Sequence, residues 1–498
     1  MKLRFIANFR VLEILDATQT ELDQLEKLST AHGYNWRTKE KWSKCFMQNY
    51  KYIPAGFWLD IMELTKAKRP WNVNIINMKD LFYNITHDEF NEWLDEQPLK
   101  FPPRWYQAKG AYLALKYRIS KGQFATSAGK SFIQFIVCRY GLQKMVSPDK
   151  KILVIVPSIM LVNQLAEDFD DYATDDLVVC DRIFGGSKRN KDGNVVISTI
   201  DSLANREKDF FTQFEMILVD EAHKLTTKTY QEVISWIPYQ QIKLIYAVSG
   251  TFHDKGTYEA MIQQQYGGPT LIDITASQLM EEGSVTPLKI KVLNLRYGYD
   301  ISEGYYNFDG ISTTDGRNLA ELKYIQSLSK RFKMISNTVA KIDGNQLLLF
   351  KSVEYAEMMA EYLKRHNPNK EVFVIHGGIK SKTRDYIRKR SEEIDNGIIC
   401  ATYATMSTGV SIKRLTYLHL MESAKSFIML RQSIGRTLRL HPSKDYAIVV
   451  DYVDIFKRYE KHWSPPMHGN ISARQAKSRQ KIYKEQNFEF TVHDVNIN

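Results

Sequence analysis

The stretch FATSAGKSFIQFIV at residues 124–137 joins a run of small residues to a helical pattern of apolar ones. Small residues let a backbone wrap closely around a phosphate with its N–H groups pointing inward, and the helix start adds its positive dipole end. Lys130 would reach the β and γ phosphates of a nucleotide, and the hydroxyl of Ser131 would hold Mg²⁺. The generic pattern G-x-x-x-x-G-K-[ST] fails at its first glycine, where Phe124 stands, so a simple capped helix start is an alternative.

A second stretch, MILVDEAH at residues 216–223, places two carboxylates directly after an apolar run. In α/β folds, residues just past a buried strand lie at the sheet edge where ligands bind. Asp220 would hold Mg²⁺ through water, and Glu221 would orient or deprotonate an attacking water. Because a phosphate loop precedes this stretch along the chain, a nucleotide site explains it better than a solvated acidic loop does.

From about residue 104 to 460 the chain alternates apolar runs with helical patterns. Runs that are apolar throughout suit strands buried on both faces, and strands separated by helices imply parallel sheets. The runs are too numerous for one compact sheet, so the sequence predicts an α/β protein with two parallel-sheet lobes. The runs include residues 151–156, 195–197, 216–219, 244–248, 346–350, 372–375, 397–400, 415–420 and 447–450.

Four regions are predicted from these patterns: a small α+β domain over residues 1–90, a first lobe over 91–285, a second lobe over 286–464 and a short basic tail over 465–498. Turn signals with few apolar runs place the crossover between the lobes within residues 286–335. In the N-terminal domain we expect strands at Phe5–Leu15 and Lys51–Leu59 around a helix at Thr20–His32. Its tryptophans would either fill a core or stack on bases.

The composition is that of a basic globular protein with 498 residues and a net charge of +11. A basic balance favours a polyanionic partner, although many basic proteins bind none. The four cysteines form no C-x-x-C pair, which suits free thiols in a reducing compartment. We find neither a signal peptide nor an apolar stretch that could cross a membrane, and therefore expect a soluble protein of the cytoplasm, that of the host cell if the protein is viral.

These motifs resemble those of superfamily 2 helicases over about 350 residues, and among them the phage recombination helicases of the UvsW type. The cues are TSAGKS at 126–131, QLMEEG at 278–283, STGVSIK at 407–413 and the small basic N-terminal domain. The acidic box here is Asp-Glu-Ala-His, whereas the prototype has cysteine at its third position. The resemblance implies RecA-like lobes, ATP and Mg²⁺ as cofactors, and DNA as the partner.

The resemblance also implies roles for single residues. Gln107 would recognise the adenine edge, and His223 would contact a coupling motif formed by Ser249, Gly250 and Thr251. Arg436 and Arg439, three residues apart on one helix face, would act as arginine fingers on the γ-phosphate. Gln432 would join these arginines in catalysis. The residues expected to bind the nucleotide are Gln107, Thr126, Ser127, Ala128, Gly129, Lys130, Ser131 and Gly409. Those expected to contact the nucleic-acid backbone are Pro157, Gln164, Ser198, Thr199, His376, Arg384, Thr402 and Thr405.

The function implied is an ATP-dependent DNA helicase or translocase that remodels branched DNA, by branch migration or by unwinding forks and loops. Binding to branched or duplex DNA would be independent of sequence and weakened by salt, because the motifs offer phosphate contacts only. We expect a monomer. The alternatives are an RNA helicase of the DEAH type and a nucleic-acid sensor that does not hydrolyse ATP. The loop at Ser187–Lys191 and a basic helix at Arg474–Lys484 would either add DNA contacts or be simply solvated.

Overall fold

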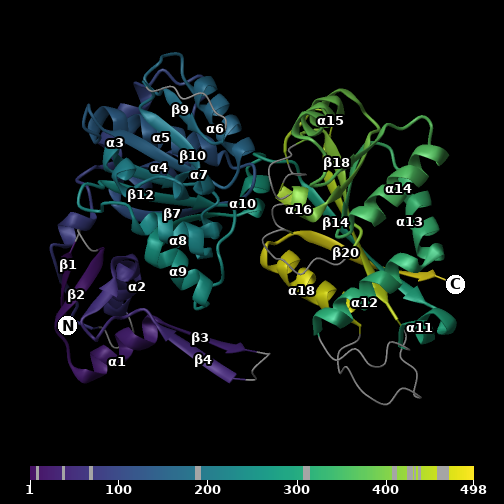
Figure 1. The fold of residues 1–498 in the computed structure, drawn as a ribbon, viewed down its shortest axis with the longest axis horizontal. Helices are drawn as coiled ribbons and strands as arrows, with labels where there is room; N and C mark the ends of the chain where they lie inside the picture. The colour runs from purple at the N-terminus through teal and green to yellow at the C-terminus, as the bar shows by residue number, and fades with distance from the viewer. Residues whose placement is uncertain are drawn as a thin grey trace. The chain divides into compact units, whose positions relative to one another are not determined.

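The computed structural model describes most of the chain and divides it into two compact units, Met1–Ile274 and Thr275–Asn498. Figure 1 labels the helices and strands of both units. The described residues are 1–6, 10–35, 40–66, 71–185, 192–306, 314–406, 412–422, 430, 433–435, 439–442, 444–456 and 470–497.

The main part of the first unit is a seven-stranded parallel sheet in the order β13-β7-β12-β11-β8-β10-β9. Its central strands β11 and β12 are buried along their whole length, and β8 is buried at every residue except Lys151, as the continuous apolar runs predict. The strands are β7 Ile119–Phe124, β8 Lys151–Val156, β9 Cys180–Ile183, β10 Val195–Thr199, β11 Phe214–Val219, β12 Leu244–Ser249 and β13 Thr270–Ile274. The helices are α4 Trp105–Lys116, α5 Lys130–Lys144, α6 Ile159–Tyr172, α7 Ile200–Ala204, α8 Lys228–Ser235 and α9 Tyr258–Gly267, with 3-10 turns η5 Lys208–Gln213 and η6 Ala222–Thr226.

The N-terminal domain belongs to the same unit and has a four-stranded mixed sheet of order β5-β2-β1-β6. Strands β3 and β4 pair separately as a hairpin that extends from it (Figure 1). The sheet strands are β1 Lys2–Ile6, β2 Val11–Asp16, β5 Tyr52–Pro54 and β6 Asn74–Ile76; the hairpin strands are β3 Thr30–Asn35 and β4 Glu40–Cys45. The helices are α1 Gln19–Leu28, α2 Trp58–Glu63 and α3 His87–Asp95, with 3-10 turns η2 Ala55–Phe57, η3 Leu64–Lys66 and η4 Met78–Leu81.

Two expectations for this domain are corrected. The strand expected at Phe5–Leu15 is two antiparallel strands, β1 and β2, because the chain reverses near Arg10, which has a positive φ of 51°. The strand expected at Lys51–Leu59 ends at Pro54, where a 3-10 turn begins and leads into helix α2. The second error overlooks Pro54 and Gly56, which are residues that favour a turn at this point.

The second unit contains another seven-stranded parallel sheet, in the order β16-β17-β15-β18-β19-β14-β20. Its strands are β14 Leu288–Tyr297, β15 Asn345–Phe350, β16 Val372–Ile375, β17 Ile398–Thr402, β18 Leu415–Leu420, β19 Ala447–Ile455 and β20 Glu489–Ile497. Its helices are α10 Ala276–Glu281, α11 Tyr299–Tyr306, α12 Thr314–Ser327, α13 Ser329–Lys341, α14 Val353–His366, α15 Ser381–Glu393, α16 Tyr403–Met406 and α18 Ile471–Glu485. The fold is therefore the predicted one, with two parallel sheets and a small N-terminal mixed sheet.

Two segments at the borders of the predicted regions are strands of this second sheet. Strand β14 lies where the sequence suggests a crossover, and it alternates between buried and exposed residues instead of being apolar throughout. Strand β20, in the segment predicted as a tail, pairs with β14 along its length. Helix α18 precedes it, and the N-terminal N–H groups of Ile471 and Ser472 bind the Glu321 carboxylate of α12 at 2.8 and 2.6 Å. The tail is thus an integral part of the second unit.

Candidate ATP site

The phosphate loop follows β7 and ends where helix α5 begins at Lys130. Gly129, the N-cap residue, has a φ of 79°, in the left-handed region that favours glycine. A side-chain carbon at this position would lie 2.4 Å from Nε2 of Gln107, so the glycine is required by space as well as by backbone angle. The loop therefore has the tight turn into a helix N-terminus that suits a phosphate.

Gln107 holds this loop from the start of helix α4. Its Oε1 accepts from the backbone N–H of Arg104 at 2.9 Å, and its Nε2 donates to the Ala128 carbonyl at 2.8 Å. The side chain is buried. The amide thus positions the phosphate loop directly, while its contact with adenine stays a prediction.

The acidic residues Asp220 and Glu221 follow strand β11. Strand β11 lies next to β12, and β12 lies next to β7, the strand that precedes the phosphate loop. The buried Oδ1 of Asp220 has no hydrogen-bond partner among the residues that the structure describes. Burial, with a further contribution from the charge of Glu221, raises the pKa of Asp220 to about 6, and the charge of Lys130 opposes this shift. Glu221 has a φ of 47°, a strained conformation typical of functional sites.

His223 and Ser249 meet between β11 and β12. Nδ1 of His223 lies 3.0 Å from Oγ of Ser249 and 3.2 Å from Oε2 of Glu221, and Ser249 donates to the same carboxylate at 3.4 Å. A side-chain carbon at Gly250 would lie 3.7 Å from both Nζ of Lys130 and Oγ1 of Thr126. The structure thus brings His223 to the Ser249–Thr251 segment, which adjoins the phosphate loop, while the coupling role of this segment stays a prediction.

Two of the residues predicted to contact nucleic acid in this unit, Ser198 and Thr199, use their hydroxyls within the protein. The Ser198 hydroxyl is fully buried and donates to the carbonyl of Ile183 at 3.0 Å. The Thr199 hydroxyl caps helix α7 by accepting from the N–H of Ser202 at 3.3 Å. Pro157 and Gln164 are half-buried beyond the end of β8. A backbone contact at Ser198 and Thr199 would therefore have to come from the main chain.

In the second unit the candidates also follow parallel strands. His376, after β16, lies 3.2 Å from the Glu357 carboxylate, and Arg384 is half-buried on α15. The hydroxyls of Thr402 and Thr405 bond to each other at 2.8 Å. The carbonyl of Arg439 accepts from Thr286 at 3.1 Å. Gly409, Gln432, Arg436 and the loop at Ser187–Lys191 lie outside the described residues.

Two protein families match this chain. The family described as type III restriction enzyme, res subunit, matches residues 114–254, and the helicase conserved C-terminal domain matches residues 330–441. The ATP-dependent DNA helicase UvsW of Enterobacteria phage T4 is 31% identical over 447 residues, which are 86% of this chain and 85% of that protein. The chain belongs to the superfamily 2 helicases. It is a homologue of an ATP-dependent DNA helicase.

Solved structures share the fold of this helicase. The restriction-modification enzyme LlaBIII bound to DNA is 14% identical, with a TM-score of 0.57 over 80% of this chain and 32% of that one. Mss116p bound to single-stranded RNA and AMP-PNP is 14% identical, with a TM-score of 0.55 over 84% of this chain and 80% of that one. Within its described residues, the helicase has no helix long and apolar enough to cross a membrane.

One residue at the ATP site of the helicase was missed from the sequence. The hydroxyl of Tyr172, at the end of α6, lies 2.6 Å from that of Ser131, and its ring packs against Phe132 at 4.8 Å between ring centroids. Tyr172 thus fixes the serine that is predicted to hold Mg²⁺. No spacing rule indicates this pair, because the packing of α6 on α5 brings it together.

Proposed function

We propose that this helicase uses ATP hydrolysis to move along DNA and to remodel branched DNA, by branch migration or by unwinding forks, D-loops and R-loops. The observation that carries the proposal is the bonded set of Glu221, His223 and Ser249 beside the phosphate loop. These contacts connect Glu221, which would act on the attacking water, with the Ser249–Thr251 segment, which would couple hydrolysis to movement along DNA. The choice of DNA is supported by the relation to UvsW, which is named a DNA helicase.

In this proposal the residues of the first unit prepare hydrolysis. Lys130 binds the β and γ phosphates of ATP, and Glu221 orients the attacking water and accepts its proton. Mg²⁺, when bound, neutralises the charge that develops on the phosphates. Asp220 and Ser131 would hold it, and the unpartnered, buried Oδ1 of Asp220 fits that role. The described residues hold no cluster of three His, Cys, Asp or Glu side chains, but Mg²⁺ usually keeps waters and substrate phosphates as ligands and needs no such cage.

The second unit would complete the site. By the resemblance, Arg436 and Arg439 would act as arginine fingers on the γ-phosphate, while Gln432 would serve catalysis and Gly409 nucleotide binding. Such fingers are worth about 10³–10⁵ in rate, so neither unit alone would hydrolyse ATP efficiently.

DNA would be bound through its phosphates by Pro157, Gln164, Ser198, Thr199, His376, Arg384, Thr402 and Thr405. The N-terminal domain would hold duplex near a junction. Separating a base-pair step costs about 1.4 kcal/mol, whereas branch migration breaks and forms pairs together at nearly no net cost. A compact monomeric motor suits this task. The four free thiols suit a reducing compartment. They support a location in the cytoplasm, that of the host cell if the protein is viral.

The test measures ATP turnover and strand separation on DNA forks, four-way junctions, R-loops and RNA duplexes. We expect forks and junctions to stimulate turnover and to be processed, with affinity that falls as salt rises. Glu221→Gln should bind the same substrates and lose turnover. An unchanged turnover in Glu221→Gln would refute the enzyme proposal, and stimulation by RNA alone would establish the RNA helicase instead.

A further inference from the structure

Helix α9 is the next helix after the Ser249–Thr251 segment, and its residue Gln263 is fully buried against the acidic motif. Nε2 of Gln263 donates to the carbonyl of His223 at 3.1 Å and lies 2.8 Å from Nδ1 of His253. Its Oε1 accepts from the backbone N–H of His253 at 3.1 Å. A buried amide with both ends engaged has one orientation, so Gln263 fixes the backbone of His223.

The next residue, Gln264, faces the N-terminal domain. Its Nε2 donates to the Gly56 carbonyl at 3.1 Å and to the Asp60 carboxylate. A side-chain carbon at Gly56 would lie 1.9 Å from the backbone carbonyl oxygen of Gln264. The N-terminal domain therefore packs directly against α9, without room for one additional methyl group. Asp60 also pairs with Lys255 at 2.6 Å, just before α9. Two neighbouring residues of one helix therefore hold the acidic motif and the N-terminal domain.

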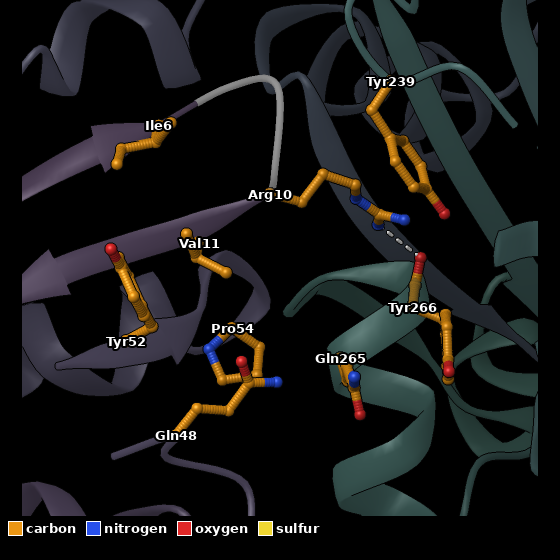
Figure 2. Close-up of a pocket in the computed structure, with 9 residues that line it drawn as sticks. All are labelled: Ile6, Arg10, Val11, Gln48, Tyr52, Pro54, Tyr239, Gln265 and Tyr266. Carbon is orange, nitrogen blue, oxygen red and sulfur yellow. Dashed lines mark hydrogen bonds between the residues drawn. The ribbon is translucent and has the colours of Figure 1, made fainter. Parts of the chain in front are cut away.

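Both ends of α9 contact the N-terminal domain as well. At its first residue, the hydroxyl of Tyr258 accepts from Lys44 of the β3–β4 hairpin at 2.9 Å, and its ring meets Trp42 edge-on at 5.6 Å. Near its last turn, the carbonyl of Tyr266 accepts from Arg10 at 2.6 Å, and the Arg10 guanidinium lies 4.4 Å from the centre of the Tyr239 ring (Figure 2). A force on the N-terminal domain would thus act along the whole helix.

We infer that Gln263 is a positioning residue for ATP hydrolysis and that α9 transmits DNA binding by the N-terminal domain to the acidic motif. The inference rests on the proposed function, since it assigns the N-terminal domain to duplex DNA. A small shift of α9 moves the amide of Gln263 and with it the carbonyl of His223. His223 contacts Glu221, so the carboxylate is re-aimed at the position of the water.

The test uses the full-length protein with Gln264→Ala, a half-buried position outside the ATP site. We expect basal ATP turnover and fork affinity to stay within about twofold, while the maximal stimulation by fork DNA falls about fivefold or more, as loss of the two partly buried hydrogen bonds of Gln264 allows. Gln265→Ala is the matched control. Its amide, on the same helix, has no hydrogen-bond partner among the described residues, and stimulation should stay normal.

A second variant, Gln263→Glu, keeps the acceptor for His253 and loses the donor to His223. We expect kcat to fall about tenfold with KM for ATP unchanged, because the loss of one buried donor acts on the position of the catalytic carboxylate. The double variant Gln263→Glu/Gln264→Ala should lose no more stimulation by fork DNA than the more strongly affected single variant. The two losses should not add, because both residues act in the same pathway. Full stimulation in Gln264→Ala, or an equal loss in Gln265→Ala, overturns the inference that α9 transmits DNA binding to the acidic motif. A wild-type protein whose ATP turnover ignores DNA would refute the proposed function itself.

Discussion

Nδ1 of His223 lies 3.0 Å from Oγ of Ser249, and both side chains contact the same carboxylate, that of Glu221. Two neighbouring strands, β11 and β12, supply these residues at their carboxyl ends. A change at Glu221 during hydrolysis therefore has a direct path to the segment that leads into α9.

Removing the Ser249 hydroxyl should separate ATP turnover from movement. In Ser249→Ala the phosphate loop and Glu221 remain, so we expect turnover within about threefold of wild type, and strand separation lower by about tenfold, which corresponds to one hydrogen bond. Both rates are measured on the same fork. Ser202→Ala, which loses a hydroxyl at the distant cap of α7, is the control and should leave both rates unchanged. A parallel fall of both rates in Ser249→Ala would contradict a coupling role.

Gly129→Ala should abolish efficient ATP use. The new carbon would lie 2.4 Å from the amide of Gln107, on a backbone with a φ of 79°. Relieving that contact requires the loop or Gln107 to move, so we expect turnover to fall by about tenfold or more through a misplaced Lys130.

Gly256→Ala separates the two causes of this loss. Gly256 also has a positive φ, 90°, but nothing lies within 4 Å of the carbon that alanine would add. Its substitution costs backbone strain alone, about 1 kcal/mol, and should lower the melting temperature by a few degrees without changing turnover. If the two variants lost equal activity, the contact with Gln107 would not be the cause.

The sequence predicts those parts of the fold that depend on local pattern. Strand β11 and the carboxylates after it were identified because a run buried on both faces is continuous and apolar. The sequence does not indicate strand β14, because its residues alternate, nor the pairing of β20 with β14, because that pairing joins segments far apart in the chain. Tyr172 and Gln263 were missed for the same reason, since only the packing of helices brings them to Ser131 and His223. Tertiary contacts of this kind have no local signature.

The buried pair of Arg479 and Asp451 should make helix α18 essential for the second unit. Arg479 donates to both oxygens of the carboxylate, at 2.9 and 2.8 Å, and Tyr483 donates to it at 3.0 Å. Removing one partner of a buried pair costs about 3–5 kcal/mol, because the other charge stays buried without compensation. Urea unfolding of Arg479→Met should show a loss of this size.

Lys481→Ala is the matched control for Arg479→Met. It lies on the same helix, and its pair with Glu485, at 3.6 Å, is exposed. Exposed pairs contribute about 0–1 kcal/mol, so this variant should unfold almost as the wild type does. Equal stability of the two variants would mean that α18 is a dispensable tail.

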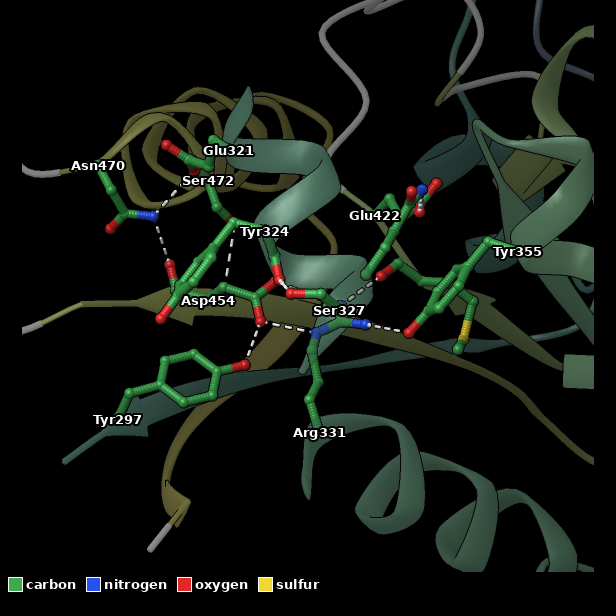
Figure 3. Close-up of polar contacts among 12 residues, drawn as sticks. Tyr297, Glu321, Tyr324, Ser327, Arg331, Tyr355, Glu422, Asp454, Asn470 and Ser472 are labelled. Atoms are coloured by element: carbon green, nitrogen blue, oxygen red, sulfur yellow. Dashed lines mark hydrogen bonds and ion pairs between the residues drawn. The ribbon is translucent and has the colours of Figure 1, made fainter. Parts of the chain in front are cut away.

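A second buried network shows the same dependence on distant segments. Figure 3 shows the Asp454 carboxylate between Tyr297 and Arg331, and Nε of Arg331 donates to it at 2.7 Å. Nη2 of Arg331 also donates to the Met421 carbonyl at 2.6 Å, one residue after β18 ends. These bonds connect strands β14, β18 and β19 with helix α13 at one end of the sheet. They hold the ends of these strands in a single arrangement.

Lys121 should make the stability of the first unit depend on pH. It is buried in strand β7 with its ammonium group 5.0 Å from the centre of the Phe252 ring, and burial lowers its pKa from 10.5 to about 7. Between pH 7 and 10.5 the unfolded chain keeps a proton that the folded protein has released, so stability rises with pH across this window. Below pH 7 both states are protonated, and the full cost, roughly 3–5 kcal/mol, is present.

Lys121→Met fills nearly the same volume without a charge and removes this cost. We expect the variant to be more stable than wild type by a few kcal/mol at pH 7, and the difference to shrink steadily towards pH 10 as the wild-type lysine buries in its neutral form. Melting temperatures at pH 7, 8, 9 and 10 measure this, with Lys144→Met, at an exposed position on α5, as the control that should follow wild type. A stability difference that does not change with pH would show that Lys121 stays charged in the folded protein and contradict this prediction.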